Sequence, residues 1–284
     1  MYPRKFDYTA PRTIADAVAA LAGDEGAKVM AGGMSLLPLM KMRLLSPATI
    51  VDIGRIDGLD RIEDRGDHIA VGALVRHAET AASDLVQTHA PALARAASLT
   101  GDVQVRNKGT TCGSLAHADI AADQTAAVIA LGATMVATGP GGTREIAAAD
   151  FFVDTLTSAL APDEILTEVR IPKGGSGSAY DKLGRRGGRS DYAVAGAAAW
   201  VDKTNGSITA ARVAVTGVGT KPMLVEAVGA ALVGTDGSPE AIAAAAEHAT
   251  EGVTLLEDLY GSEEYKAHLA KVYAARALTE ALGG

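Results

Sequence analysis

The sequence predicts an α+β protein of two domains. Its 284 residues exceed the roughly 100–200 of a typical domain, and 48% of them are hydrophobic, which is enough for two cores. Strand and helix patterns alternate in the first half, whereas strands precede helices in the last third. A stretch rich in Pro, Gly and Ser at 172–178 separates the parts. We expect domains at 1–175 and 177–284.

The N-terminal domain begins with two strand and helix signals. Residues 12–22 place apolar side chains on one helical face, and Thr13 with Asp16 suits a capping box. Residues 27–30 read as a buried strand that ends in a Gly-Gly turn. A second helix is expected at 35–44, with a serine at its N-cap position.

The rest of the chain continues both patterns. In the N-terminal domain we expect strands at 49–53, 68–75, 133–138 and 164–171, helices at 76–82, 91–98 and 120–131, and a loop at 109–114. In the C-terminal domain we expect strands at 193–202 and 208–218, and helices at 222–232, 239–249 and 262–281.

Composition excludes several classes of function. The net charge of −8 repels phosphate backbones, so no nucleic-acid partner is expected. There is no apolar run long enough to span a membrane and no secretory signal, so we expect a cytoplasmic protein. Its single cysteine, Cys112, cannot supply the four thiolates of an iron–sulfur cluster. Any redox cofactor of this chain should therefore be organic, with no metal bound.

Two glycine loops are the best candidates for a binding site. Residues 31–35 (AGGMS) lie between a strand and a helix, and residues 109–114 (GTTCGS) precede a helical segment. Glycines let backbone N–H groups approach a ligand, and hydroxyls donate to phosphate oxygens. Two such loops facing each other could hold a pyrophosphate. Either loop alone is more often an ordinary tight turn.

Common nucleotide and hydrolase motifs do not occur. The sequence contains no GxGxxG after a strand, no GxxxxGK[ST] and no GxSxG.

Further polar residues have two interpretations each. His117 and Asp119 could be metal ligands or an acid–base pair, or they could cap the next helix. Asp123 lies in an Ala-rich stretch and needs a hydrogen-bond donor, either a sugar-like hydroxyl or a backbone N–H. A basic cluster could contact phosphate or a partner, or form a solvated loop; it comprises Lys182, Arg185, Arg186 and Arg189.

Together these segments resemble the FAD-binding medium subunits of molybdenum hydroxylases, which include aerobic carbon monoxide dehydrogenase and the flavin domain of xanthine dehydrogenase. That family carries AGGxSL, then TxGGS followed by AHADPAAD. This chain has AGGMSL at 31–36 and GTTCGSLAHADIAAD at 109–123, and the resemblance covers nearly its whole length. It implies a two-part FAD-binding domain of the vanillyl-alcohol-oxidase (PCMH) type and a small α+β C-terminal domain.

The resemblance also implies contacts to FAD. The pyrophosphate would be held by Ala31, Gly32, Gly33, Met34, Ser35, Leu36, Thr110, Thr111, Cys112, Gly113 and Ser114. Asp123 would bind the ribityl hydroxyls, Leu166 the flavin or adenine side, and Lys182 would lie near the ring, while Tyr192 would shield the flavin face. No acid–base catalytic residue is implied in this chain.

Four positions depart from the family pattern. Met34 replaces a residue that is often polar, and Ile120 replaces a proline. Cys112 replaces a glycine, so its Cβ would strain the loop if that position needed a positive φ. Thr100 stands where the xanthine dehydrogenase branch tends to have an aromatic residue, which favours the carbon monoxide dehydrogenase branch.

The family implies an electron relay. A large molybdopterin subunit would oxidise the substrate, [2Fe–2S] clusters on a small subunit would carry single electrons, and FAD would pass them to a quinone or other acceptor. A dimer of heterotrimers, associated at most peripherally with the inner membrane face, is expected. The alternatives are a medium subunit for purine- or nicotine-type heterocycles, a stand-alone flavoprotein using His77 or His117 as a base, and a scaffold without FAD.

Overall fold

The N-terminal lobe is a small parallel sheet with one helix on each side. The computed structural model describes residues 2–186 and 191–283. The order β1–β3–β2 is parallel throughout, as helical crossovers require. Thr13 caps the first helix by accepting from the N–H of Asp16 at 3.1 Å. The elements are β1 (Asp7–Thr9), α1 (Ile14–Ala22), β2 (Lys28–Met30), α2 (Leu36–Lys41) and β3 (Thr49–Asp52).

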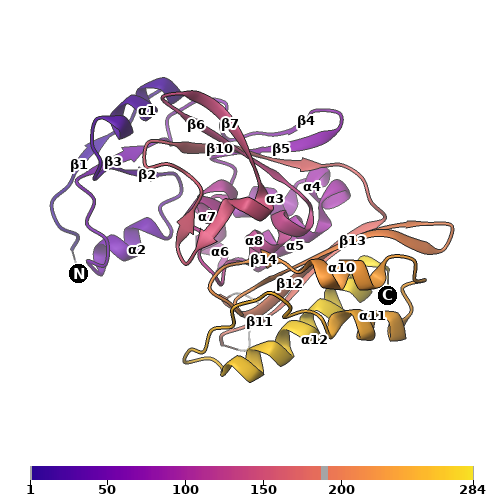
Figure 1. Ribbon diagram of the computed structural model, residues 1–284. Coiled ribbons are helices and arrows are strands. Elements are labelled where there is room, and N and C mark those ends of the chain that lie inside the picture. Colours follow the sequence, from indigo (N-terminus) through magenta and orange to yellow (C-terminus); the bar gives the residue numbers. More distant parts are fainter. Residues whose placement is uncertain (1, 187–190, 284) are drawn as a thin grey trace.

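A five-stranded antiparallel sheet and a layer of short helices complete the N-terminal domain (Figure 1). The strand order is β4–β5–β10–β6–β7. The strands are β4 (Ile62–Asp64), β5 (His68–Gly72), β6 (Thr134–Gly139), β7 (Gly142–Ala147) and β10 (Ile165–Pro172), with a small pair β8 (Phe152–Asp154) and β9 (Thr157–Ser158). The helices are α3 (His77–Ala82), α4 (Asp84–His89), α5 (Pro91–Leu99), α6 (Val103–Arg106), α7 (Thr111–His117), α8 (Asp123–Ala130) and α9 (Ala148–Phe151).

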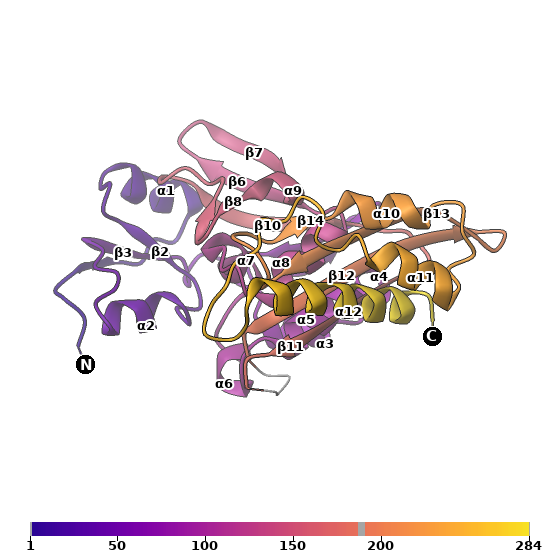
Figure 2. The same cartoon turned by 60° about the horizontal axis from the view of Figure 1, so that its bottom comes forward.

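The C-terminal domain is an antiparallel sheet with three helices on its outer face, and its inner face lies against the N-terminal helices (Figures 1 and 2). The order is β11–β12–β13–β14. The elements are β11 (Gly177–Gly184), β12 (Ala193–Thr204), β13 (Ser207–Thr216), β14 (Met223–Leu224), α10 (Glu226–Leu232), α11 (Pro239–Ala246) and α12 (Glu263–Ala281).

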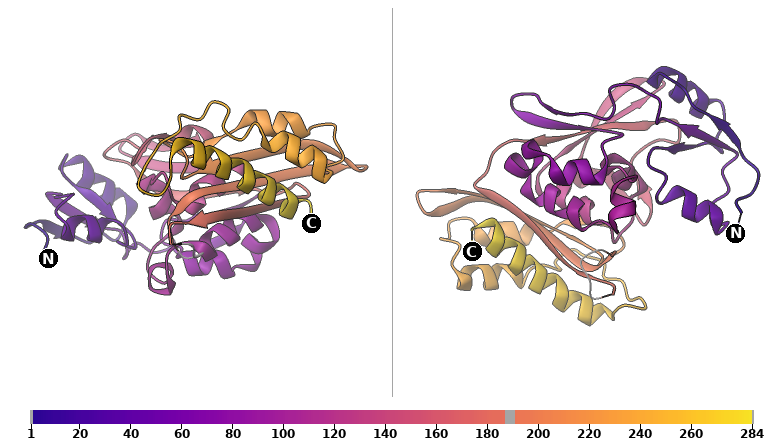
Figure 3. Two further views of the ribbon diagram at one scale, coloured as in Figure 1. Left: turned by 90° about the horizontal axis from the view of Figure 1, so that it is seen from below. Right: turned by 180° about the vertical axis from the view of Figure 1, so that it is seen from behind.

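Strand β12 is buried on both faces, which explains its Ala- and Val-rich sequence. Successive side chains of a strand point to opposite faces. Ala197 and Ala199 accordingly pack in the C-terminal core, whereas Ala198 between them packs in the core of the N-terminal domain. Small side chains let both helical layers approach the sheet closely. The two views of Figure 3 show the C-terminal sheet between these layers.

Arg212 on β13 adds a polar link between the domains. Its guanidinium donates to the carbonyl oxygens of Ala130 at 2.8 Å and Leu131 at 3.3 Å, which end α8. The same group lies 3.9 Å from the centroid of the Trp200 ring. The arginine therefore satisfies carbonyls at a helix terminus of the other domain.

The element predictions are largely confirmed, with three corrections. The helix expected at 222–232 begins only at Glu226, because Met223–Leu224 form strand β14. The helix expected at 35–44 ends at Lys41, and the loop expected at 109–114 is instead the start of helix α7. Thr110 caps that helix by accepting from the N–H of Gly113 at 3.1 Å. Strands β7 and β11 were not predicted; the sequence of β7, GTREIA, is mostly exposed and polar. In the described ranges, no helix is long and apolar enough to cross a membrane.

Candidate cofactor site

The two glycine loops touch each other, as the sequence predicted. A Cβ added to Gly32 would lie 2.1 Å from the carbonyl oxygen of Lys108 and 2.7 Å from Cα of Gly109. A Cβ on Gly113 would lie 3.9 Å from the side chain of Ala31. Gly33 adopts a φ of +70°, which an L side chain rarely adopts. The glycines therefore bring two backbone segments together at distances that side chains would prevent.

Free donors line the first loop. Within the described residues, the N–H groups of Met34, Ser35 and Leu36 have no hydrogen-bond partner, and the Ser35 hydroxyl makes no capping bond. These three positions open α2, where backbone donors point away from the helix. Such a run of amides suits the oxygens of a phosphate ester. Met34 cannot make the side-chain hydrogen bond of the polar residue that it replaces, but its backbone N–H is still available.

Backbone hydrogen bonds to Val75 and His77, between β5 and the start of α3, hold the second loop in place. His77 N–H donates to the carbonyl of Gly109 at 3.0 Å, and Thr111 N–H donates to that of Val75 at 3.0 Å. The buried hydroxyls of Thr80 and Thr111 are 2.7 Å apart. The Thr111 hydroxyl and backbone N–H are thus both occupied inside the protein, so neither is free to donate to a cofactor phosphate.

Cys112 does not strain the loop, contrary to the concern raised by its sequence position. It lies in the first turn of α7 and is absent from the positive-φ residues. Its side chain is 1% exposed, and Sγ lies 3.5 Å from the carbonyl oxygen of Val71. Burial raises the pKa of the thiol to about 12. The thiol is therefore neutral and packs as a small apolar group beneath the loop.

Asp123 and Lys182 form a buried ion pair across the domain boundary. Asp123 begins α8, and Lys182 lies on β11; the ammonium is 2.7 Å from the carboxylate. Tyr180 Oη donates to Asp123 Oδ1 at 2.6 Å, and Lys182 also donates to the carbonyls of Leu99, at 3.1 Å, and Asp191. Burial raises the pKa of Asp123 to about 6, against the opposing effect of Lys182.

This network bears on two of the predictions. The solvated-loop interpretation is wrong for Lys182, whose side chain is 0% exposed. The donor that Asp123 needed is neither of the two expected kinds but a phenol and an ammonium group. A carboxylate retains further lone pairs when it accepts two bonds, so its role toward ribityl hydroxyls stays a prediction.

The remaining members of the basic cluster behave differently from Lys182. The Arg185 guanidinium lies 5.0 Å from the ring centroid of Tyr192 and 4.7 Å from that of Tyr260. Arg186 is exposed and pairs with Asp191 at 3.2 Å. Arg189 lies outside the described residues. Tyr192 is 42% exposed, with the Arg185 guanidinium over its ring.

For three candidates from the sequence, Leu166, His117 and Asp119, the structure adds no evidence of a role in cofactor or metal binding. Leu166 is 4% exposed on β10, beside a β-bulge, and its contact to FAD stays a prediction. Asp119 accepts from the N–H of Ala121 at 2.9 Å, so it shapes the turn before α8. In the described ranges, no three His, Cys, Asp or Glu residues are grouped so that they could bind a metal. His117 and Asp119 therefore have no third ligand among these residues.

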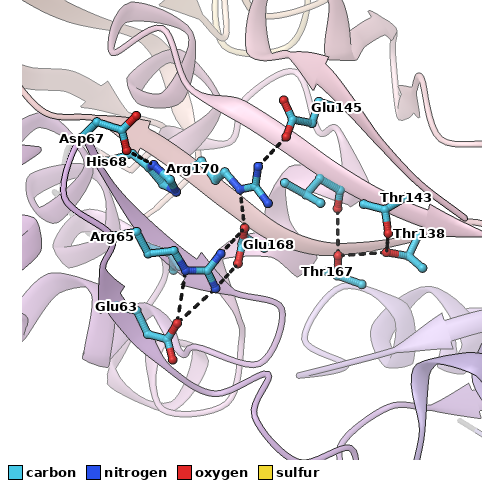
Figure 4. Close-up of polar contacts among 12 residues, drawn as sticks. Glu63, Arg65, Asp67, His68, Thr138, Thr143, Glu145, Thr167, Glu168 and Arg170 are labelled. Atoms are coloured by element: carbon cyan, nitrogen blue, oxygen red, sulfur yellow. Dashed lines mark hydrogen bonds and ion pairs between the residues drawn. The ribbon is translucent and has the colours of Figure 1, made fainter.

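The polar outer face of the five-stranded sheet is a separate feature (Figure 4). Glu168 lies between two arginines, 2.9 Å from Arg65 and 2.5 Å from Arg170, above a groove of about 330 Å³. This face is opposite the one against which α7 packs, because Ala70 and Gly72 line the groove whereas Val71 lies in the core. Ion pairs join Glu63, Arg65, Glu168 and Arg170 across this face.

Sequence reasoning named His77 only as a possible base and missed the buried pair that it forms with Gln124 next to the second loop. Gln124 Nε2 lies 2.7 Å from His77 Nδ1 and 3.1 Å from Thr100 Oγ1. A Cβ on Gly109 would lie 2.8 Å from His77 Nε2, so the imidazole abuts the loop directly. Burial, reinforced by the charge of Arg106, lowers the pKa of His77 to about 4. The imidazole is therefore neutral near pH 7. His77 stands between Arg76 and Glu79 in the sequence, so its neighbours gave no signal of this burial.

His77 should make the protein acid-sensitive. Its folded pKa is below the unfolded value, so its contribution is complete above about pH 6.5 and is lost as the pH falls toward 4. We expect the free energy of unfolding to fall by about 2 kcal/mol between about pH 7 and about pH 5 from this group alone. The His77→Gln variant should lose that slope in urea titrations, whereas the exposed-site control His248→Gln should keep it. Equal slopes in both variants would refute this role.

Sequence signatures identify both domains. The FAD binding domain in molybdopterin dehydrogenase matches residues 4–174, and the CO dehydrogenase flavoprotein C-terminal domain matches residues 178–281. The medium chain of carbon monoxide dehydrogenase from Hydrogenophaga pseudoflava is 39% identical, over 99% of this chain and 98% of that protein. The nicotine 6-hydroxylase medium subunit from Paenarthrobacter nicotinovorans is 37% identical, over 96% of both chains.

Solved structures agree with these relationships. A chain of carbon monoxide dehydrogenase from Hydrogenophaga pseudoflava superimposes with a TM-score of 0.95, at 39% identity and 99% coverage of both chains. A chain of quinoline 2-oxidoreductase from Pseudomonas putida 86 superimposes with a TM-score of 0.93, at 33% identity, over 99% of this chain and 98% of that one. The chain therefore belongs to the family of FAD-binding medium subunits of molybdenum hydroxylases, with a two-part FAD-binding domain and a CO dehydrogenase flavoprotein C-terminal domain.

Proposed function

We propose that this chain carries electrons within an aerobic carbon monoxide dehydrogenase-like enzyme. It would accept them from [2Fe–2S] clusters of a small subunit, while a large molybdopterin subunit oxidises the substrate, in a dimer of heterotrimers. A quinone or another acceptor would then take them. The observation that carries the proposal is the contact between the two glycine loops, where Gly32 meets Lys108. We place the domain boundary between 175 and 177, after β10.

The residues at this contact would bind the cofactor through main-chain groups. The amides of Met34, Ser35 and Leu36, with that of Cys112 in the first turn of α7, would hold the two phosphates of FAD. Bound FAD supplies the exchange between one-electron and two-electron transfer. The protein orients it: Asp123 and Lys182 would fix the ribityl and ring side, and Tyr192 would cover one ring face.

The heterocycle hydroxylases supply a second candidate substrate class. The nicotine 6-hydroxylase medium subunit is 37% identical to this chain, and the caffeine dehydrogenase subunit beta of Pseudomonas sp. (strain CBB1) is 32% identical. We favour carbon monoxide because Thr100 is small at the position where the xanthine dehydrogenase branch tends to have an aromatic residue. The substrate pocket itself would be on the large subunit.

Purification of the intact complex tests the proposal. We expect one FAD per copy of this chain, and bleaching of the flavin absorbance when carbon monoxide is added to the anaerobic complex. The isolated chain, loaded with FAD, should not bleach under the same conditions. Bleaching by nicotine or a purine in place of carbon monoxide would transfer the assignment to the heterocycle class. A lone chain that its own substrate reduces would refute the electron-transfer role.

A further inference from the structure

A buried imidazole faces the place where the two glycine loops meet. His77 begins α3 and is 3% exposed. Its ring edge lies against Gly109, because a Cβ added to that glycine would lie 2.8 Å from Nε2 and 2.9 Å from Cδ2. Gly109 in turn lies against Gly32, whose added Cβ would be 2.7 Å from the Gly109 Cα. The missing side chain of Gly109 therefore leaves space in front of Nε2, beside the contact between the loops.

The orientation of the Gln124 amide follows from its hydrogen bond to Thr100. A hydroxyl group carries one proton, and Thr100 donates it to the carbonyl oxygen of Ala96 at 2.9 Å. The Thr100 oxygen can therefore only accept from Gln124. The amide atom that lies 3.1 Å from Thr100 Oγ1 must then be the nitrogen. Hydrogen-bond counting thus assigns the positions of the nitrogen and the oxygen of this side chain.

The same amide nitrogen determines the tautomer of His77. Gln124 Nε2 lies 2.7 Å from His77 Nδ1 and can only donate, so Nδ1 is the acceptor of this hydrogen bond. The proton of the neutral imidazole is therefore on Nε2, the atom that faces Gly109. Within the part of the chain that the structure describes, this N–H has no protein acceptor. Buried donors in folded proteins are nearly always satisfied, so an unpartnered one beside a binding loop indicates a ligand atom.

The charges around the ring favour an anionic acceptor. With its pKa lowered to about 4 by burial and by the charge of Arg106, the imidazole of His77 is neutral near pH 7. Arg106 on α6 is held by the carbonyl oxygen of Gly101, to which it donates at 2.7 Å. The acidic residues next along the two helices are occupied elsewhere: Glu79 caps α3, and Asp123 pairs with the other domain. A donor in a positive potential suits a phosphate oxygen.

We propose that His77 Nε2–H donates a hydrogen bond to a phosphate oxygen of bound FAD, and that Gln124 is the positioning residue that keeps the proton on this nitrogen. This inference rests on the proposed function, because it places the FAD phosphates at the two glycine loops. It gives Gly109 a second role, since any side chain there would fill the space in front of Nε2. Figure 1 shows α3, α6 and α8, which carry these groups, in one helical layer.

Two substitutions of His77 separate hydrogen bonding from packing. The intact complex is purified, its FAD is removed, and rebinding is measured by equilibrium dialysis at neutral pH. His77→Phe keeps a ring and removes the donor, and we expect it to bind FAD about tenfold more weakly. His77→Gln removes the ring but offers an amide N–H in place of Nε2–H, and should stay within about threefold of the wild type. Weaker binding by His77→Gln than by His77→Phe would show that the ring only fills space, and would overturn the inference.

Gln124→Glu tests the tautomer. A carboxylate can only accept, so it would draw the imidazole proton to Nδ1 and turn a lone pair of Nε2 toward the phosphate. We expect FAD binding about tenfold weaker than in the wild type at about pH 8, with recovery as the pH falls, because an imidazolium carries a proton on both nitrogens. Gln87→Glu, at an exposed glutamine of α4, is the matched control and should bind FAD like the wild type.

A direct reading of the ring does not depend on any variant. In ¹H–¹⁵N spectra of the full-length chain, His77 should show a protonated Nε2 and an unprotonated Nδ1. The opposite tautomer would refute the inference.

Competition by ADP, which carries the two phosphates without the flavin, identifies the half of FAD that is bound. The loss caused by His77→Phe should be equal for ADP and FAD. A loss with FAD alone would place the contact on the flavin half and overturn the inference. Unchanged affinity of His77→Phe for both would contradict this inference alone, whereas a wild-type complex without FAD would contradict the proposed function itself.

Discussion

A Gly32→Ala variant is expected to bind FAD about 10- to 100-fold more weakly than the wild-type chain. The new methyl group would lie 2.1 Å from the carbonyl oxygen of Lys108 and 2.8 Å from its carbonyl carbon. These atoms belong to a backbone that is itself fixed, since Gly109 N–H donates to Val105 O at 2.7 Å. The two loops must separate, at a cost typical of overpacking, about 1–3 kcal/mol. The amides would then no longer converge on one pyrophosphate.

Flavin absorbance per purified chain and fluorescence titration of the apoprotein with FAD measure this effect. Gly141→Ala is the matched control, because an added Cβ there meets nothing within 4 Å. We expect the control to bind FAD like the wild type. Full FAD content in the Gly32→Ala chain would show that the loop contact is not where the phosphates bind.

The second large effect is expected from Lys182→Met. Removing the ammonium leaves Asp123 buried without its charge partner, which typically costs about 3–5 kcal/mol of unfolding free energy. The double variant Asp123→Asn/Lys182→Met should recover much of that loss, because no ionised group remains buried. Lys271→Met breaks an ion pair with Glu247 whose side chains are 35% and 68% exposed, and should cost only about 0–1 kcal/mol.

The loss of unfolding free energy in Lys182→Met should depend on pH, and the burial of Asp123 determines the direction of that dependence. Burial raises the pKa of Asp123 to about 6, so its contribution to stability is present below about pH 4 and is lost as the pH rises through 6. Lys182 opposes this shift, so its removal moves the pKa of Asp123 higher still. Urea titrations should therefore show a larger loss for Lys182→Met at about pH 8 than at about pH 5. A loss that does not change with pH would contradict this account.

Local signals in the sequence were sufficient for most elements. Thr13 before an apolar helical face identified the start of α1, and the Gly-Gly turn identified the end of β2. The two glycine loops were recognised because glycine allows close approach of two backbones, which the contact at Gly32 confirms. Helix α7 was missed because its short segment, TCGSLAH, contains a glycine and lacks apolar periodicity.

Contacts between distant residues could not be predicted in this way. Asp123 is paired with Lys182 and Tyr180, which are 59 and 57 positions away on a strand of the other domain. Alternation along β11 puts residues 180 and 182 on one face, but the sequence does not show what that face covers. His77 and Gln124 are likewise 47 positions apart. Their juxtaposition depends on tertiary packing alone.

The insertion of β12 between the two cores has a consequence for dissection of the protein. A fragment that ended at Pro172 would lose Tyr180, Ala198 and Ala214 from its own apolar interior. It would also expose the carbonyls at the end of α8 that Arg212 satisfies and leave Asp123 without either donor. The region that carries the cofactor-binding signature is thus a sequence unit but not a self-sufficient folding unit.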